Sequence, residues 1–479
     1  MNHLEHQARF GHSLRRAPFV PWMDWFLYSP FFPLLTAFLA FLSCSYSLEL
    51  LVYGVYCLFF VYMSLFGRDF LPAIPLIVCC YIAPSGANNP GINEASVFWG
   101  KTGLVIMGYF LVIVAAVVVR LVTDGEMGGK AFLRHRRALL PGMLALGASY
   151  FLAGAGSGHY FDHGINNWLF ALLQFAAVFL PYYFISGAVK WEQAPKNYLA
   201  WVGICTGAAL IAETVFLYRN GNILLDGNIL RANIFLGWGH YNNIGAFLTM
   251  MIPFAFQLAC GKRGWVWLAG GVLLLFGVVL TWSRASMLTA GVIFLLCCLL
   301  LIYRTRNRWL AAGLTLVICG GLIWLLKEKG RELVQALGES FVDGTNIFGR
   351  ENIYQAGLAQ FRKYPIFGGA FFPLDYEVFV WADVEKFTAF APPRWHNTVV
   401  QLLATGGVVS LAAYGFHRWQ TIQVIWKKPT TENLCIALSV AALLIASLMD
   451  CHFFNVGPTL FYSMALAFAE NAPTSEEIE

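Results

Sequence analysis

The stretch GLVIMGYFLVIVAAVVVRLVT, residues 103–123, contains a single charged side chain, Arg120, near its end. A helix needs roughly 18 to 20 apolar residues to cross about 30 Å of hydrocarbon. The stretch meets that requirement without interruption. It therefore predicts a transmembrane helix.

Apolar runs of this kind recur along the whole chain. Of its 479 residues, 58% are hydrophobic and 12% are charged, too few charges to cover a soluble protein of this size. A β-barrel would show short alternating strands instead. We predict an all-α, polytopic transmembrane bundle of about 14 spans, within a range of 12 to 14. The predicted spans are 30–46, 48–66, 70–85, 103–123, 138–156, 167–187, 198–218, 243–260, 264–282, 285–303, 308–326, 397–415, 432–449 and 456–470.

These spans divide the chain into five parts. We expect a cytoplasmic N-terminal segment (1–29), eleven transmembrane helices (30–326), an exported helical loop (327–395), three further transmembrane helices (396–470) and a cytoplasmic tail (471–479). The first 20 residues are polar and basic, so no cleavable signal peptide is expected.

The distribution of lysine and arginine predicts the orientation. Short cytoplasmic loops retain these residues and exported loops do not. With the N-terminus in the cytoplasm, the basic segments RFGHSLRR, KAFLRHRR, VKWEQAPK, GKRG, YRTRNR and HRW…KK are all cytoplasmic. An even number of spans returns the acidic tail SEEIE to the same side. The net charge of +5 is thereby explained without a nucleic-acid partner.

The long loop 327–395 is the only sizeable soluble element. It contains two helix-like stretches, GRELVQALGESFV and RENIYQAGLAQFRKY, separated by Gly, Asp and Asn residues. We expect it to cap an outward-facing cavity. The eleven cysteines lie almost entirely in apolar segments without C-x-x-C spacing, which favours buried core positions.

Three arginines fall on the predicted outer side. Arg284 lies in the short turn TWSRASML, Arg231 in NILRANIFLGWGHYNN, and Arg350 begins a helix-like stretch of the long loop. An interfacial cation that reaches to lipid headgroups is the alternative interpretation of Arg284. Guanidinium groups bind phosphate oxygens bidentately and keep their charge, so converging arginines suit a lipid-linked pyrophosphate.

His396 begins a span in the string PPRWHNTVVQLLATGG. An imidazole has an ordinary pKa of about 6.5, which suits proton abstraction near neutrality. The alternative is an interfacial histidine beside Trp395. Asp450 and Glu213 are acidic residues placed to orient an arginine or a histidine near the membrane. His159, Asp162 and His163 in HYFDH are loosely spaced, and we expect no metal site there.

Several motifs are absent. There is no P-loop, no G-x-S-x-G, no H-E-x-x-H and no exported D-x-D pair. Neither ATP nor a metal-bound nucleotide sugar is indicated. A lipid pyrophosphate needs neither, because it is already an activated leaving group that requires charge stabilisation and a base for the acceptor hydroxyl.

The second half of the chain, from about Arg231 to Asp450, resembles the O-antigen ligase and O-antigen polymerase superfamily. The ligase element R-x-x-x-L reads Arg284 to Leu288 here. The element H-[NSQ]-x9-G-x-x-[GTY] reads His396, Asn397 and Gly407 but ends on Ser410, a departure from the pattern. Two further phrases are similar to family segments, RANIFLGWGHYNN, which ends on Asn243, and GRENIYQAGLAQFRKYPIFGGA, which contains Pro-x-x-Gly.

The resemblance implies a GT-C type membrane glycosyltransferase of the bacterial cytoplasmic membrane. It takes a glycan from undecaprenyl pyrophosphate on the outer side and inverts the anomeric centre without a metal or nucleotide cofactor. Arg231 and Arg284 would contact the pyrophosphate, with help from Arg350. His396 would deprotonate the acceptor hydroxyl, and Asn397 would support it.

Two alternatives to a ligase remain open. A polymerase of the same superfamily would use a second lipid-linked glycan as acceptor, and an O-oligosaccharyltransferase would use a protein hydroxyl. A transporter of lipid-linked oligosaccharide belongs to a different class and would be expected to show repeat symmetry and charged residues in the middle of several spans. Neither feature is evident in the sequence.

Overall fold

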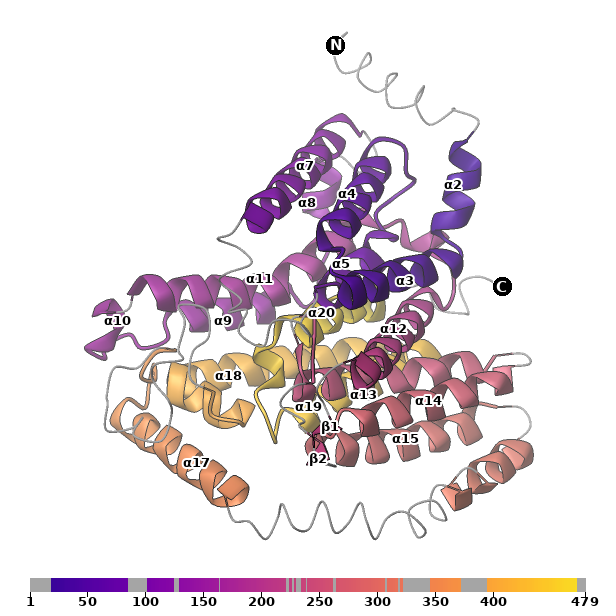
Figure 1. Cartoon of the computed structure of the whole chain (residues 1–479). Helices are drawn as coiled ribbons and strands as arrows, with labels where there is room; N and C mark the ends of the chain where they lie inside the picture. The colour runs from indigo at the N-terminus through magenta and orange to yellow at the C-terminus, as the bar shows by residue number, and fades with distance from the viewer. Residues whose placement is uncertain are drawn as a thin grey trace.

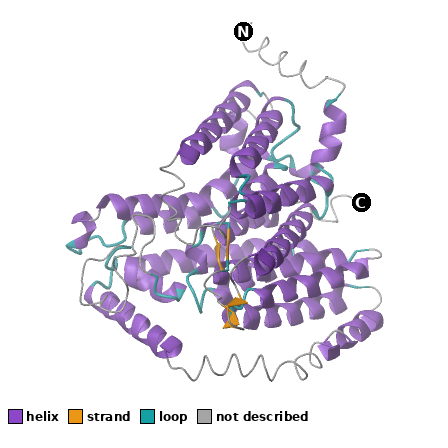
Figure 2. Cartoon of the chain, viewed as in Figure 1, coloured by secondary structure: helices purple, strands orange, loops and turns teal. Residues whose placement is uncertain are grey.

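The computed structural model describes residues 19–84, 101–124, 129–162, 164–220, 224–225, 228–229, 234–237, 239–261, 264–305, 308–317, 319–321, 345–371 and 394–471. Figure 1 shows that this part of the chain is built from helices, and Figure 2 marks two small hairpins among them. The main helices are α2 (Val20–Leu27), α3 (Phe31–Tyr46), α4 (Glu49–Leu65), α5 (Ala73–Ile82), α7 (Lys101–Thr123), α8 (Gly129–Arg134), α9 (Leu140–Phe151), α10 (His159–Asp162), α11 (Gly164–Ala188), α12 (Tyr198–Asn220), α13 (Tyr241–Ala259), α14 (Trp267–Leu280), α15 (Arg284–Arg304), α17 (Thr345–Lys363), α18 (Thr398–Lys427), α19 (Thr431–Ala446) and α20 (Val456–Asn471).

The two hairpins lie between α12 and α13. In the first, β1 (Leu224–Leu225) pairs with β2 (Asn228–Ile229), and in the second, β3 (Phe235–Leu236) pairs with β4 (Gly239–His240), both antiparallel. The sequence analysis did not predict them. They are too short for the alternating pattern that reveals a strand in a sequence.

The helical membrane-protein class is confirmed. Among the described residues, five helices are long and apolar enough to cross a membrane, namely α7, α11, α12, α15 and α18. The pair α2 and α3, bent by 71°, makes a sixth if it is one span. Other apolar helices have 10–17 residues. At about 1.5 Å per residue these reach less than the roughly 30 Å of hydrocarbon. The count of 14 spans and the cytoplasmic location of both termini stay predictions.

Helix α7 shows that apolar character and internal burial are separate properties in this fold. Only 6% of its most apolar stretch is buried inside the protein. It packs against α4 at the edge of the molecule (Figure 1). In α13, by contrast, every residue from Asn243 to Ala259 is buried. Since lipid solvates apolar side chains as well as a protein core does, only the tertiary structure distinguishes a peripheral span from a central one.

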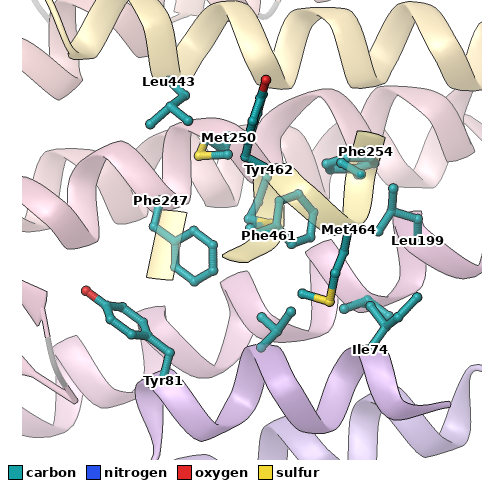
Figure 3. Packing of buried hydrophobic residues seen from close by; sticks show 14 of the residues in the cluster. Ile74, Tyr81, Leu199, Phe247, Met250, Phe254, Leu443, Phe461, Tyr462 and Met464 are labelled. Atoms are coloured by element: carbon teal, nitrogen blue, oxygen red, sulfur yellow. The ribbon is translucent and has the colours of Figure 1, made fainter. Parts of the chain in front are cut away.

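Helix α13 is at the centre of the core. It packs against α12, α14, α15 and α19, which surround it, and also contacts α20. Figure 3 shows Phe247, Met250 and Phe254 of α13 interleaved with Phe461 and Met464 of α20. The rings of Phe254 and Phe461 meet edge to face with centroids 5.4 Å apart. This packing fixes the first turn of α13 relative to the segment that precedes α20.

Helix α18 is broken at Gly407, the glycine of the H-N-x9-G element. Its backbone has φ 63° and ψ −158°, a conformation that only glycine adopts readily. The segment that follows α17 fills the break. Val408 N donates to Pro365 O at 2.9 Å, and Gly369 N donates to Ala404 O at 2.8 Å. Two motifs that are separate in the sequence, Pro-x-x-Gly and H-N-x9-G, therefore form one backbone junction between α17 and α18.

Replacement of Gly407 by alanine is expected to destabilise this junction. A Cβ atom there would lie 2.3 Å from Ile366 O, and the backbone would remain in a region unfavourable for alanine. We expect a loss of about 1–3 kcal/mol, measured as a lower melting temperature of the purified protein in lipid nanodiscs. The matched control is Gly415→Ala in the same helix, where a Cβ meets nothing within 4 Å. Equal melting temperatures for the two variants would contradict the requirement for glycine at position 407.

Candidate active site

Asn397 fixes the start of α18. Its Oδ1 accepts hydrogen bonds from Val399 N at 2.8 Å and Val400 N at 3.2 Å, as an N-cap does. Its Nδ2 donates to Leu448 O at 2.8 Å. The same side chain therefore closes the helix end and ties it to the turn after α19. These contacts show a structural role for Asn397, and its support of catalysis stays a prediction.

His396 precedes this cap in a strained conformation. Its φ is 48°, in the left-handed region, which costs a non-glycine residue free energy. The surroundings hold it there, because Tyr354 of α17 donates a hydrogen bond to His396 O at 3.1 Å. The neighbouring Trp395 is buried and packs between α17 and α18. The imidazole itself remains 36% exposed and so is open to a reactant.

Asp450 lies beside the imidazole. His396 Nδ1 and Asp450 Oδ1 are 3.3 Å apart, although the residues are 54 positions apart in the sequence. The aspartate is buried at 6% exposure. A carboxylate that accepts the Nδ1 hydrogen leaves the lone pair on Nε2, the arrangement that lets an imidazole act as a base. The acidic partner predicted for a histidine is thus Asp450.

The carboxylate of Asp450 is fully engaged. Cys451 N donates to Oδ1 at 2.7 Å and Asn242 Nδ2 donates to Oδ2 at 3.1 Å. Burial alone would raise the pKa of Asp450. The hydrogen bond from His396 and the electrostatic interactions with His452, His396 and Arg394 outweigh burial and hold that pKa well below its usual range. Asp450 is therefore ionised at neutral pH.

Asn242 connects this pair to the start of α15. Ser283 Oγ donates to Asn242 Oδ1 at 2.9 Å and also lies 2.9 Å from Ser286 Oγ. Ser283 is the residue before Arg284, which is half-buried at the first position of α15. The preceding Trp282 has a left-handed φ of 54°. The structure thus brings the turn that carries Arg284 into the same polar network as His396.

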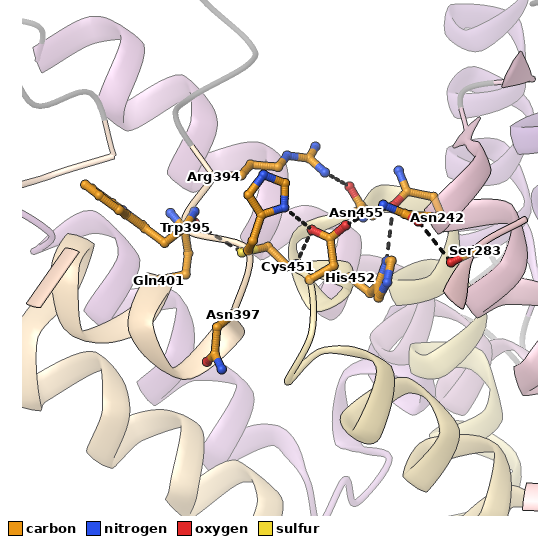
Figure 4. A network of polar contacts seen from close by, with 12 residues as sticks. Asn242, Ser283, Arg394, Trp395, Asn397, Gln401, Cys451, His452 and Asn455 are labelled. Atoms are coloured by element: carbon orange, nitrogen blue, oxygen red, sulfur yellow. Dashed lines mark hydrogen bonds and ion pairs between the residues drawn. The ribbon is translucent and has the colours of Figure 1, made fainter. Parts of the chain in front are cut away.

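A second row of polar side chains adjoins the first. Asn243 Oδ1 accepts a hydrogen bond from Asn455 Nδ2 and lies 3.1 Å from His452 Nδ1. Arg394 Nη1 donates to Asn455 Oδ1 (Figure 4). Asn243, His452 and Asn455 are buried. This places Asn243, predicted as a supporting residue, within the network.

Sequence reasoning missed several members of the network, among them Asn242, Ser283, Arg394 and Asn455. Arg394 lies two positions before His396, so its cationic side chain could have been noted. Asn242 and Ser283 flank residues that were singled out. Nothing in the sequence indicates that Asn455 approaches Asn243, because the contact joins helices 212 positions apart.

The remaining predicted residues lie elsewhere or outside the described part. Glu213 is buried in α12, where its electrostatic neighbours are Cys44 of α3 and Tyr56 of α4 rather than His396 or Arg284. Arg231 lies outside the described residues. Arg350 falls within α17, but its side chain is outside the described part, as are the side chains of His159, Asp162 and His163. The first helix-like stretch predicted in the long loop, residues 330–342, also lies outside the described residues.

The chemistry available at the site follows from these groups. A partly exposed imidazole backed by an ionised carboxylate can remove a proton from a hydroxyl. A nearby guanidinium can stabilise negative charge on a leaving group. The two functions lie at the starts of α18 and α15 and are connected through Asp450, Asn242 and Ser283. A substitution reaction at a carbon that carries a phosphate leaving group uses both.

Part of the chain is similar to a known protein family. No curated protein matches the chain. A family model described as O-Antigen ligase matches residues 269–415. The match includes α15 with Arg284, the described part of the long loop, the junction at Gly407 and His396. Over residues 269–415 the chain is therefore similar to the O-antigen ligase family, and this similarity supports the O-antigen ligase superfamily that its motifs indicate.

Proposed function

We propose that this protein transfers a glycan from undecaprenyl pyrophosphate to an acceptor hydroxyl on the outer side of the bacterial cytoplasmic membrane, as an O-antigen ligase does. The observation that carries the proposal is the contact of 3.3 Å between His396 and Asp450 in a network that also includes the turn before Arg284. The similarity of residues 269–415 to the O-antigen ligase family and the long apolar helices support glycosyl transfer within a membrane.

In the proposed step, His396 Nε2 removes the proton of the acceptor hydroxyl. The acceptor oxygen then forms a bond to the anomeric carbon as the bond between that carbon and the pyrophosphate oxygen breaks. The electron pair leaves with undecaprenyl pyrophosphate, and a single displacement inverts the anomeric centre. Asp450 stabilises the imidazolium that forms, because its carboxylate faces Nδ1 at 3.3 Å.

The arginines stabilise the leaving group in this proposal. Arg284 contacts the pyrophosphate, with Arg231 and Arg350 as further ligands from the flanking segments. Guanidinium groups suit this task because they stay charged and bind phosphate oxygens bidentately. Arg394, hydrogen-bonded to Asn455, adds a positive charge near Asp450. No metal or nucleotide is needed, since the donor already carries its leaving group.

A transfer assay tests the function. The purified protein in nanodiscs is incubated with undecaprenyl-pyrophosphate-linked glycan and a lipid A core acceptor, and products are identified by mass spectrometry. We expect one glycan mass on the acceptor, release of undecaprenyl pyrophosphate and the same rate in the presence of EDTA. Arg284→Ala is expected to lower the rate roughly 10- to 100-fold, the loss of one charged hydrogen bond worth about 1.5–3 kcal/mol.

Arg304→Ala, at the other end of α15, is the matched control and should keep the parental rate. Growth of the glycan on its own lipid would assign the protein to the polymerases of the superfamily instead. Movement of intact lipid-linked glycan across liposomes without any new linkage would favour a transporter and refute glycosyl transfer. A parental rate for Arg284→Ala would remove Arg284 from the site.

A further inference from the structure

Arg418 is a buried cation in the interior of the helical bundle. It lies on α18 and is 9% exposed. Its guanidinium carbon is 4.4 Å from the ring centroid of Tyr414, 4.3 Å from that of Phe453 and 4.7 Å from that of Tyr462. No Asp or Glu of the described residues lies within ion-pair distance of it. Three aromatic faces therefore surround a charge that would ordinarily be paired.

One of these rings belongs to the segment that carries the proposed site. Phe453 is the central residue of η6 (His452–Phe454), the short helix that directly follows Asp450 and Cys451. Its ring also meets Tyr414 with centroids 5.3 Å apart. The cation thus binds the turn that presents Asp450 to His396. His396 lies just before the N-cap of α18, and Arg418 lies in the part of α18 that follows the break at Gly407. Arg418 is therefore linked to Asp450 through Phe453 and to His396 along the chain of α18.

The energetics argue against a purely stabilising role for this charge. Cation–π contacts favour a desolvated guanidinium, but its removal from water opposes burial. Well-packed apolar side chains therefore often replace buried charges without loss of stability. What the charge adds is a directional preference for ring faces. That preference fixes where Phe453, and the turn around it, must lie.

We propose that Arg418 is a positioning residue for glycan transfer, which holds the turn 450–455 so that Asp450 stays within hydrogen-bond distance of His396. The inference rests on the proposed function for its effect on rate. Its structural part concerns the position of the turn and can be measured independently. Cys451 supplies that measurement, because it lies in the turn, is fully buried and follows Asp450 directly.

The test compares Arg418→Met with the parental protein in nanodiscs. We expect kcat to fall roughly 10- to 100-fold with little change in KM, because a misplacement of about 1 Å can cost that much. The melting temperature should be unchanged or higher. Alkylation of Cys451 by N-ethylmaleimide, followed by peptide mass spectrometry, should become at least several-fold faster. Arg418→Lys keeps the charge and should restore part of both effects.

Phe453→Leu is the second variant, which removes the ring and leaves the arginine in place. It should reproduce the loss of kcat and the exposure of Cys451 even if Arg418→Met does not fold. Arg68→Met is the matched control, since Arg68 lies 3.8 Å from the ring of Tyr28 in another part of the bundle. It should leave both readouts unchanged.

The outcomes separate the inference from the proposed function. The inference would be overturned if Arg418→Met and Phe453→Leu kept the parental kcat and the slow alkylation of Cys451. The proposed function would not be affected by that result. The parental protein and all variants could fail to transfer glycan while Cys451 still becomes exposed in Arg418→Met. That result would support the positional role of Arg418 and refute the proposed function. Faster alkylation with an unchanged kcat in an active protein would overturn the catalytic consequence.

Discussion

His396→Ala is expected to lower the rate of glycan transfer by roughly 10²- to 10⁴-fold, the usual contribution of a general base. The imidazole is the partly exposed group of the site that can accept a proton while its Nδ1 faces Asp450 at 3.3 Å. Because the side chain acts on the acceptor hydroxyl in the transition state, kcat should fall while the KM of the lipid-linked donor changes little. Initial rates over a range of donor and acceptor concentrations measure both.

His135→Ala is the matched control for this variant. His135 also makes one polar side-chain contact, to Asn471 at 2.9 Å, but at the end of the bundle that the charge distribution assigns to the cytoplasm. It should transfer glycan at the parental rate. His396→Gln, which keeps a polar side chain without a comparable base, should be as inactive as the alanine variant. Transfer by His396→Ala at the parental rate would exclude proton abstraction by this residue.

Asp450→Asn is expected to lower the rate of glycan transfer by a similar factor, roughly 10²- to 10⁴-fold. Replacement of the aspartate that contacts a catalytic histidine by asparagine has an effect of this size in serine proteases. The carboxylate accepts from Cys451 N at Oδ1, from Asn242 Nδ2 at Oδ2 and faces His396 Nδ1. An amide has one carbonyl oxygen, so its NH₂ group must face one of these donors. The imidazole then loses both its electrostatic partner and its preferred tautomer.

A double-variant cycle provides the sharpest measurement. If Asp450 acts only through His396, the rate of the double variant His396→Ala with Asp450→Asn should be close to that of His396→Ala alone. Multiplicative losses would show that Asp450 has a separate role.

The effect of Asp450→Asn on stability is expected to depend on pH. Since the pKa of Asp450 is lowered in the folded protein, its contribution to stability is fully present above the unfolded value of about 3.9 and is lost as pH falls toward the folded value. The deficit of Asp450→Asn in melting temperature should therefore be constant from about pH 5 to 8 and shrink below about pH 4. A deficit that grew on acidification would contradict the ionised state of Asp450.

Local sequence patterns were sufficient for the helices and for part of the site. The predicted spans overlap helices where the structure describes the residues, because apolar length is a local property that needs no partner. One prediction was wrong: α18 continues to Lys427, so His417 and Arg418 of the HRW segment, expected in a cytoplasmic loop, are buried within the bundle. The same applies to His396 and Asn397, whose place at the start of α18 follows from a polar pair before an apolar run. Glu213 was different, since its neighbours in α3 and α4 could not be inferred from its own segment.

The sequence by itself determined that the chain is a helical membrane protein and which segments are apolar enough to form its helices. It also placed Arg284 and His396 at helix starts. Only the tertiary structure decided that Asp450, 54 residues after His396, is its partner, and that Asn242, 208 residues before Asp450, links both to Ser283. The physical reason is that the length of an apolar run, a local property, determines which segments enter the bilayer. Neighbours across the bundle depend instead on side-chain packing around α13, which no local pattern predicts.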